Sequence, residues 1–199
     1  MKFLLGKKEK MTQIFTEEGV VPVTVIKTSP NIVTQIKTVD KDGYSAIQVG
    51  FGSKKDKNIS KPIRGHIKEL GNFAHLKEIK TSQEFNIGDV LEITNFIEGD
   101  KVTVSAISKG KGFQGVVKRH GFKGGRRTHG QKHSEREPGS IGVGGIQRVQ
   151  KGTRMAGRMG TDRITVKNLK IARIEAESNM IYVKGAIPGR KGTLVEIKA

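Results

Sequence analysis

Apolar and polar residues alternate in short runs over the first fifty residues, a pattern typical of half-buried β-strands. Residues 20–26 and 31–37 are rich in β-branched side chains, and residues 28–31 between them (Thr-Ser-Pro-Asn) have the composition of a turn. A second turn, at residues 41–43, precedes a third run at residues 44–50. Short strands with tight connections predict an antiparallel barrel or sandwich.

The pattern changes to helical spacing between residues 61 and 80. Apolar residues there recur three or four positions apart, first as far as Leu70 and then from Phe73 onward, with Gly71 between the two runs. We therefore expect two short helices, which form a small helical insertion at residues 61–80.

Strand patterns resume after this insertion and appear again near the C-terminus, at residues 89–94, 101–107, 163–166, 170–177, 180–184 and 194–197. Two β-rich blocks therefore flank a segment without this pattern. We predict a mainly β protein, in which residues 1–108 and 161–199 together form one globular β-barrel domain. Residues 109–160 would then be a long extended internal loop, and a structureless loop of this length is usually functional.

Positive charge is concentrated in this loop. Residues 109–163 contain 14 Lys and Arg against three acidic residues, so they supply +11 of the net charge of +18, and they hold 14 of the 26 glycines. Such a segment cannot bury enough apolar surface to offset its chain entropy, so we expect an anionic partner to order it. Nucleic acid fits, because each phosphate neutralised by Lys or Arg releases counterions.

Composition disfavours several other classes of protein. The chain has no cysteine, which excludes disulfides and thiolate zinc sites and fits a reducing cytoplasm. No apolar run approaches the roughly 20 residues that cross a bilayer, and Lys7 and Lys8 come too early for a signal peptide. We therefore expect a cytoplasmic location. The lack of Trp disfavours a single-strand binder built mainly on aromatic stacking.

Residues 110–117 match the dinucleotide fingerprint G-x-G-x-x-G and its protein-kinase form. The fingerprint needs a helix directly behind it, and Gly121, Gly124 and Gly125 disfavour such a helix. The kinase form also needs V-A-I-K, H-R-D and D-F-G motifs, which the sequence lacks. We favour a role in which these glycines let the backbone lie close to a phosphate backbone.

Metal and hydrolase sites are also disfavoured. His129 and His133 lie near Glu135, but Gly130 makes a regular helix between them improbable, and no third histidine or thiolate is close. Ser140 lacks the G-x-S-x-G elbow of serine hydrolases. We therefore predict no catalytic residue, no metal and no cofactor, and a protein that is not an enzyme.

Arginine distinguishes this loop from an ordinary solvated surface, because its planar fork binds phosphate bidentately and stacks on bases. RNA is favoured, since an extended arm suits irregular folded RNA better than a duplex groove. A DNA-binding architectural protein is the alternative. The predicted RNA contacts are Lys109, Lys111, Lys118, Arg119, His120, Lys123, Arg126, Arg127, His129, Lys132, His133, Arg136, Arg148, Lys151, Arg154, Arg158 and Arg163.

A collinear series of motifs covers nearly the whole chain. Its clearest members are Met11-Thr12-Gln13-Ile14-Phe15, Gly43-Tyr44-Ser45-Ala46-Ile47-Gln48, Ser108-Lys109-Gly110-Lys111-Gly112-Phe113-Gln114-Gly115, Pro138-Gly139-Ser140-Ile141-Gly142 and Met155-Ala156-Gly157-Arg158-Met159-Gly160. In this series the sequence resembles the bacterial-type large-subunit ribosomal protein L three family.

This resemblance implies a translation-protein-like β-barrel whose basic arm reaches through the large-subunit (23S) ribosomal RNA toward the peptidyl transferase centre. It also implies binding near the 3′ end of that RNA, an early role in subunit assembly, and contacts with the neighbouring ribosomal proteins L fourteen and L nineteen. The catalytic centre in that family is RNA, so the resemblance implies a structural role within the ribosome.

The sequence departs from the family pattern at two places in the arm. Glu135 stands where a histidine is common, and its carboxylate would repel a phosphate unless Arg127 or Arg136 pairs with it. The tip, residues 143–147, lacks the Asn-Gln-Thr-Pro run in which some members carry a methylated glutamine. We do not transfer that modification to this chain.

Overall fold

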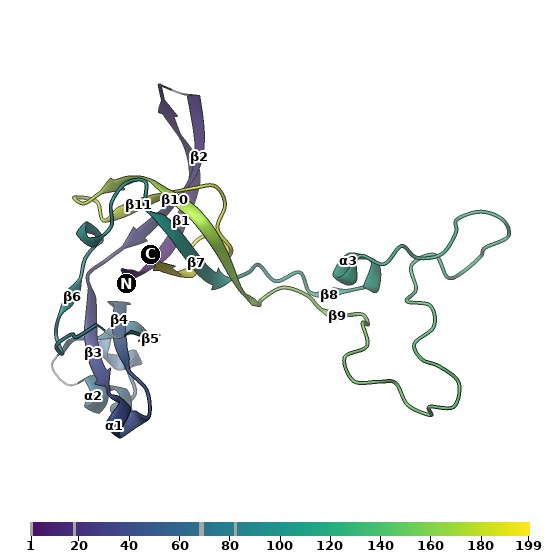
Figure 1. Ribbon diagram of the computed structural model, residues 1–199, viewed down its shortest axis with the longest axis horizontal. Helices are drawn as coiled ribbons and strands as arrows, with labels where there is room; N and C mark the ends of the chain where they lie inside the picture. Colours follow the sequence, from purple (N-terminus) through teal and green to yellow (C-terminus); the bar gives the residue numbers. More distant parts are fainter. Residues whose placement is uncertain (1, 18, 68–69, 82) are drawn as a thin grey trace. The chain divides into compact units, whose positions relative to one another are not determined.

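The computed structural model describes residues 2–17, 19–67, 70–81 and 83–199, and the chain is mainly β. It divides into two compact units. The barrel unit comprises Met1–Ile107 and Arg163–Ala199, and the arm unit comprises Ser108–Asp162. Figure 1 labels most of the helices and strands of both units.

The barrel is closed by six strands, in the order β1-β12-β7-β10-β11-β2. Every neighbouring pair is antiparallel. The strands are β1 (Phe3–Thr16), β2 (Gly19–Thr28), β7 (Lys101–Ile107), β10 (Arg163–Glu175), β11 (Met180–Lys184) and β12 (Leu194–Lys198).

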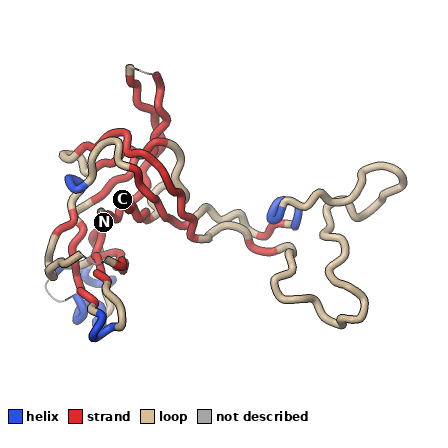
Figure 2. The backbone as a smooth tube through the Cα atoms, viewed as in Figure 1, coloured by secondary structure: helices blue, strands red, loops and turns tan. Residues whose placement is uncertain are grey.

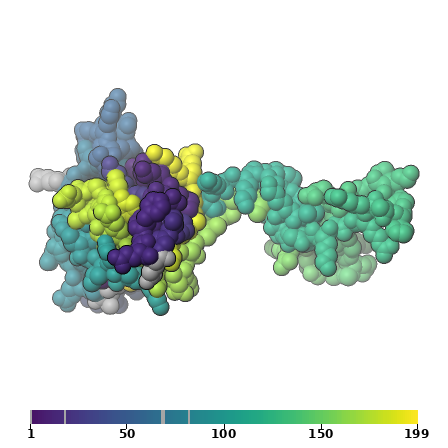
Figure 3. Space-filling model, turned by 90° about the horizontal axis from the view of Figure 1, so that it is seen from above, coloured from purple at the N-terminus to yellow at the C-terminus, as the bar shows by residue number. Residues whose placement is uncertain are grey.

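Strands from both sides of the arm complete this barrel. Strand β1 pairs with β12 from Phe3 with Lys198 to Lys7 with Leu194, and Figure 3 shows the N-terminal and C-terminal segments side by side on the surface. Strand β7 ends at Ile107 and β10 begins at Arg163, and these two residues pair directly. The chain therefore leaves the barrel and returns to it at adjacent positions.

Alternating side chains of the barrel strands form the core. Leu4, Ile26, Val104, Ile181 and Ile197 are all fully buried in one apolar cluster. Burial of a side chain of this size stabilises a fold by roughly 1.5–3 kcal/mol, so the period-two pattern in the sequence reflects the main stabilising term.

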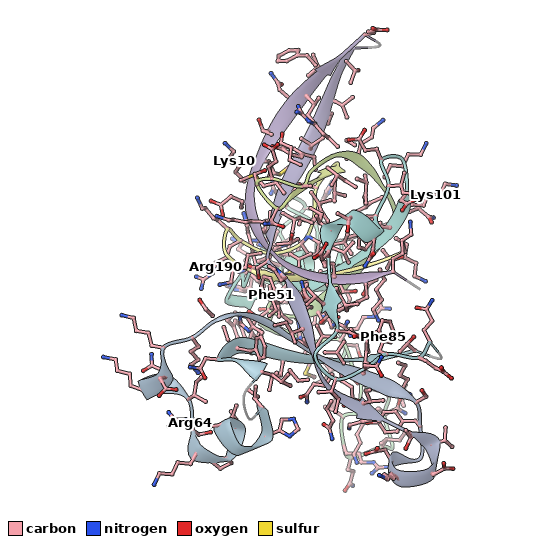
Figure 4. The ribbon with its side chains drawn as sticks, turned by 90° about the vertical axis from the view of Figure 1, so that its left-hand side faces the viewer. Lys10, Phe51, Arg64, Phe85, Lys101 and Arg190 are labelled. Carbon is pink, nitrogen blue, oxygen red and sulfur yellow. The ribbon has the colours of Figure 1, made fainter. Side chains whose placement is uncertain are left out.

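A second sheet of four strands joins the same core, in the order β5-β4-β3-β6. It consists of β3 (Asn31–Lys37), β4 (Ala46–Ser53), β5 (Phe73–Lys80) and β6 (Val90–Leu91). Phe51 of β4 is buried in this core, whereas Lys10, Arg64 and Lys101 are exposed on the barrel unit (Figure 4). The strands predicted at residues 31–37 and 44–50 therefore form, but in this sheet rather than in the barrel.

Helices are short and few among the described residues. They are α1 (Val39–Asp42), α2 (Lys61–Ile67) and α3 (Val116–His120), with 3₁₀ turns at Asp56–Asn58 and Ile93–Asn95. None of the helices in the described part of the chain has the length and apolar character needed to cross a membrane. The first helix expected in the 61–80 insertion is therefore confirmed as α2.

The second helix expected there is wrong, because Phe73–Lys80 forms strand β5. The segment whose apolar residues suggested helical spacing pairs with β4 instead, from Ala46 with Lys80 to Ser53 with Phe73. The ring of Phe73 also lies over Gly50, where an added Cβ would come within 2.5 Å of it. Tertiary pairing thus overrides a weak local period.

Strand β10 also differs from its prediction, since residues 163–166 and 170–177 were expected as separate strands. One continuous strand, Arg163–Glu175, carries an irregularity between Val166 and Leu169. Asn168 has a left-handed φ of 59° there. A bulge of this kind interrupts the alternation in the sequence without ending the strand.

Candidate nucleic-acid interface

The arm unit begins and ends as a hydrogen-bonded ribbon. The Ser108 amide donates to the Asp162 carbonyl over 2.9 Å, and the Lys111 amide donates to the Met159 carbonyl over 2.9 Å. The two-residue strands β8 (Phe113–Gln114) and β9 (Gly157–Arg158) then pair with each other. Beyond this ribbon and α3 the arm unit is loop (Figure 2).

Helix α3 opens directly after Gly115 and ends at Gly121, whose φ is 74°. The expectation that Gly121, Gly124 and Gly125 disfavour a helix behind the G-x-G-x-x-G motif is therefore wrong for this first turn. Gly121 ends the helix after five residues without preventing it. The motif lies on a pair of antiparallel two-residue strands, not in the βαβ unit that a dinucleotide site requires.

Two of the predicted RNA contacts bind the arm's own backbone. Nη1 of Arg119 donates to the Met155 carbonyl over 2.7 Å, and Nε2 of His120 lies 3.0 Å from the same oxygen. Val116 beside them is only 2 % exposed. These contacts make a small packed root, which the sequence did not indicate because Met155 is 36 residues from Arg119.

Residues 125–135 form a loop whose two ends are joined by a hydrogen bond. The Gly125 amide donates to the Glu135 carbonyl over 3.0 Å, and an added Cβ on Gly124 would clash with that oxygen. Nε of Arg127 lies 2.5 Å from Oε1 of Glu135. Arg127, and not Arg136, therefore pairs with the Glu135 carboxylate.

His129 and His133 are both exposed on this loop, and His129 has a left-handed φ of 60°. Across the described residues, no group of three or more His, Cys, Asp or Glu is placed to hold a metal ion.

The loop tip is apolar at its surface. Ile141, Val143 and Ile146 are each more than 40 % exposed, and they line a hollow of about 100 Å³ together with Gly142, Arg148, Gln150 and Thr153. Ser140 and Thr153 stabilise the tip by donating hydroxyl hydrogen bonds to nearby backbone carbonyls. The tip therefore exposes apolar side chains next to the cationic side chain of Arg148.

Most of the arm's cations make no ion pair. Residues 108–162 are all described, and they carry 13 Lys and Arg against three acids. Arg127 is the one cation among them in an ion pair. Eleven are exposed and unpaired: Lys109, Lys111, Lys118, Lys123, Arg126, Lys132, Arg136, Arg148, Lys151, Arg154 and Arg158.

Arg163 stands apart from this set because it belongs to barrel strand β10. Its Nη2 is paired with Oε2 of Glu196, and Nζ of Lys77 lies 3.4 Å from the other oxygen of that carboxylate. The structure therefore does not group Arg163 with the exposed arm cations.

A further basic cluster on the barrel unit was not predicted. Burial, followed by the positive charges of Lys7, Lys77 and Lys54, lowers the pKa of His75. Lys77 lies two residues from His75 on β5, whereas Lys7 of β1 and Lys54, which follows β4, come near the imidazole only in the fold. No local sequence signal indicates that Lys7 and Lys54 lie near His75.

A glycine-rich unit with many exposed, unpaired cations is typical of a protein that binds a polyanion. Comparison with known proteins is more specific. Residues 61–180 match the family model described as Ribosomal protein L3, and the chain belongs to that family.

Two relatives are similar over almost their entire lengths. The large ribosomal subunit protein uL3 of Herpetosiphon aurantiacus is 52 % identical, with 98 % of this chain and 94 % of the relative covered. The protein of the same name from Finegoldia magna is 49 % identical, with 100 % of this chain and 97 % of the relative covered.

Proposed function

We propose that this protein is a structural constituent of the large ribosomal subunit and binds the large-subunit (23S) ribosomal RNA through its arm unit. The observation that carries the proposal is the set of 11 exposed, unpaired Lys and Arg residues. Membership of the Ribosomal protein L3 family supports it, and both relatives are named as large-subunit proteins. Its place of action is then the ribosome, in the cytoplasm.

The finer assignment rests on the family resemblance. The protein binds near the 3′ end of the RNA, acts early in subunit assembly, and lies beside ribosomal proteins L fourteen and L nineteen. Its arm reaches toward the peptidyl transferase centre. The role is structural, and the chemistry of that centre belongs to RNA.

The proposed mechanism combines electrostatics with ordering of the chain. Exposed lysines and arginines neutralise phosphates that would otherwise repel each other as RNA packs around the arm, and the released counterions favour binding. Glycines allow the protein backbone to approach the phosphates closely. The hydrogen-bonded ribbon fixes both ends of the arm, so RNA orders only the loops between them.

Salt dependence tests the role of the arm. Replacement of Arg126, Arg136, Arg148 and Arg154 by Gln removes four exposed charges, so the slope of log K against log salt for rRNA should flatten by about three. A control with Lys41, Lys55, Lys57 and Lys101 of the barrel unit replaced by Gln should change the slope less. An unchanged slope in the arm variant would contradict the proposal.

Competition binding separates this function from a DNA-binding architectural protein. Labelled rRNA fragments are bound to the wild-type chain, and unlabelled rRNA or duplex DNA is then added at equal nucleotide concentration. We expect rRNA to displace the label at lower concentration, because irregular folded RNA fits the looped arm. Equal or stronger displacement by duplex DNA would favour the architectural role.

A further inference from the structure

Phe113 is an exposed aromatic on the most ordered part of the arm unit. It is 75 % exposed, although burial of an aromatic side chain of this size would stabilise a fold. The backbone around it is fixed, since Lys111 and Met159 are hydrogen-bonded across the ribbon and β8 pairs with β9. The position of Phe113 on the arm is therefore defined by its backbone, and its ring is not part of a core.

The two faces of this ribbon are different. Gly157 pairs with Gln114, and an added Cβ on Gly157 would lie 2.7 Å from Nη1 of Arg119. That face is therefore covered by the arm's own root. Because side chains alternate along a strand, Phe113 and its cross-strand partner Arg158 share the opposite face, and both are exposed.

Directly opposite residues on antiparallel strands have Cβ atoms about 4.5–5.5 Å apart, so the Phe113 ring and the Arg158 side chain are neighbours. Lys109 and Lys111 are exposed along the same segment, and neither forms an ion pair. Around this ring the arm unit thus offers cations and one flat apolar surface. A partner that offers both a π-face and negative charge fits this surface.

We propose that Phe113 and Arg158 form a stacking platform for one unpaired nucleobase of ribosomal RNA. The base stacks on the Phe113 ring, and the Arg158 guanidinium binds an adjoining phosphate. A ring face accepts any base, so the platform selects an unpaired nucleotide rather than a sequence. This inference rests on the proposed RNA-binding function and adds to it a specific contact that is not electrostatic.

A single tryptophan reports on this contact, because the natural sequence contains none. Phe113→Trp places an indole on the platform. The matched control is Phe15→Trp, since Phe15 is 73 % exposed on β1 of the barrel unit. Stacking on a base should quench the indole fluorescence of the Phe113→Trp variant when large-subunit rRNA is added, with little change in the control. Equal quenching in the two variants would contradict a specific platform.

Affinity provides a second readout that does not depend on tryptophan. Phe113→Leu keeps an apolar side chain but removes the π-face, so Kd for rRNA should rise by about 5- to 150-fold, which corresponds to loss of one stacked base. The salt slope should stay unchanged because no charge is lost. Arg158→Gln should instead flatten the slope by about 0.7–0.9, and Phe15→Leu should change neither quantity.

The outcomes distinguish this inference from the function on which it rests. If the wild-type chain does not bind rRNA, the proposed function fails. If it binds with the expected salt slope but Phe113→Leu has the wild-type Kd and the indole of Phe113→Trp is not quenched, only the platform is wrong. A change in the fluorescence of Phe113→Trp with another large-subunit protein in the absence of RNA would likewise overturn the platform, in favour of a protein contact.

Discussion

The barrel unit and the arm unit differ in their ion pairs and in how much apolar surface they bury. Seven of the eight ion pairs among the described residues lie in the barrel unit, and one lies in the arm unit. The buried apolar core likewise belongs to the barrel unit, whereas Val116 is the one buried apolar residue within residues 108–162. The barrel unit thus holds the buried core and most of the ion pairs, whereas the arm unit has almost no buried apolar surface and one ion pair.

This difference explains why one chain contains both kinds of sequence. The barrel strands on either side of the arm pair at Ile107 and Arg163, so the arm does not have to fold alone to be anchored. Its glycines and unpaired cations would be a liability in a core, but they are suited to an RNA environment. Perturbations should therefore affect stability in one unit and binding in the other.

The largest difference should come from truncating matched isoleucines. Ile181 is fully buried in β11, so Ile181→Ala should lower the free energy of unfolding by about 2–5 kcal/mol. Ile146 in the arm tip is 45 % exposed, and Ile146→Ala should change the free energy of unfolding by less than about 0.5 kcal/mol. Urea unfolding followed by circular dichroism measures both. Similar losses in the two variants would mean that the arm tip contributes to the fold.

A matched pair of lysines should show a smaller difference. Nζ of the buried Lys8 donates to the carbonyls of Ile187 and Gly189 over 2.7 and 3.0 Å, so it fastens the segment before β12 to β1. Lys8→Met leaves these carbonyls without that donor and should cost about 1–3 kcal/mol in unfolding experiments.

The matched variant Lys123→Met changes an exposed arm cation and should leave the free energy of unfolding unchanged. It should instead weaken rRNA binding and flatten the salt slope by about 0.7–0.9. If Lys8→Met reduced only RNA affinity, the structural role given to Lys8 would be wrong.

The smallest effect should be a pH dependence within the barrel unit. The pKa of His75 is lowered in the fold, so the folded state favours the neutral imidazole. The stability that the neutral imidazole contributes is therefore fully present above the unfolded pKa of about 6.5. It should decline as the pH falls below that value. His75→Gln should remove this decline, which unfolding curves between pH 7.5 and 5 would measure. An identical pH dependence in the variant would contradict the assignment to His75.

Sequence patterns predicted the elements whose signal is local. The strands at residues 101–107 and 180–184 have the predicted bounds, because alternation and adjacent turns define both ends. Sequence patterns gave wrong predictions where strand pairing determines the secondary structure or the sheet. Phe73–Lys80 is a strand because it pairs with β4, and β3 and β4 belong to a second sheet because of partners that no local window contains.

The candidate site divides in the same way. Composition alone indicated the cationic arm, since charge and glycine content are local properties of residues 109–160. The internal use of Arg119 and the pairing of Arg163 with Glu196 were not predictable, because these partners lie 36 and 33 residues away. The face shared by Phe113 and Arg158 likewise depends on a register that only the fold defines.

The proposed function requires that the barrel unit folds without RNA and that rRNA orders the loops of the arm unit. Limited trypsin digestion of the free chain, with the fragments mapped by mass spectrometry, tests this claim most directly. Cleavage should occur first between Lys118 and Arg158, while the barrel strands stay intact, and large-subunit rRNA should protect those sites. An arm as resistant as the barrel without RNA, or one that rRNA leaves unprotected, would contradict the account.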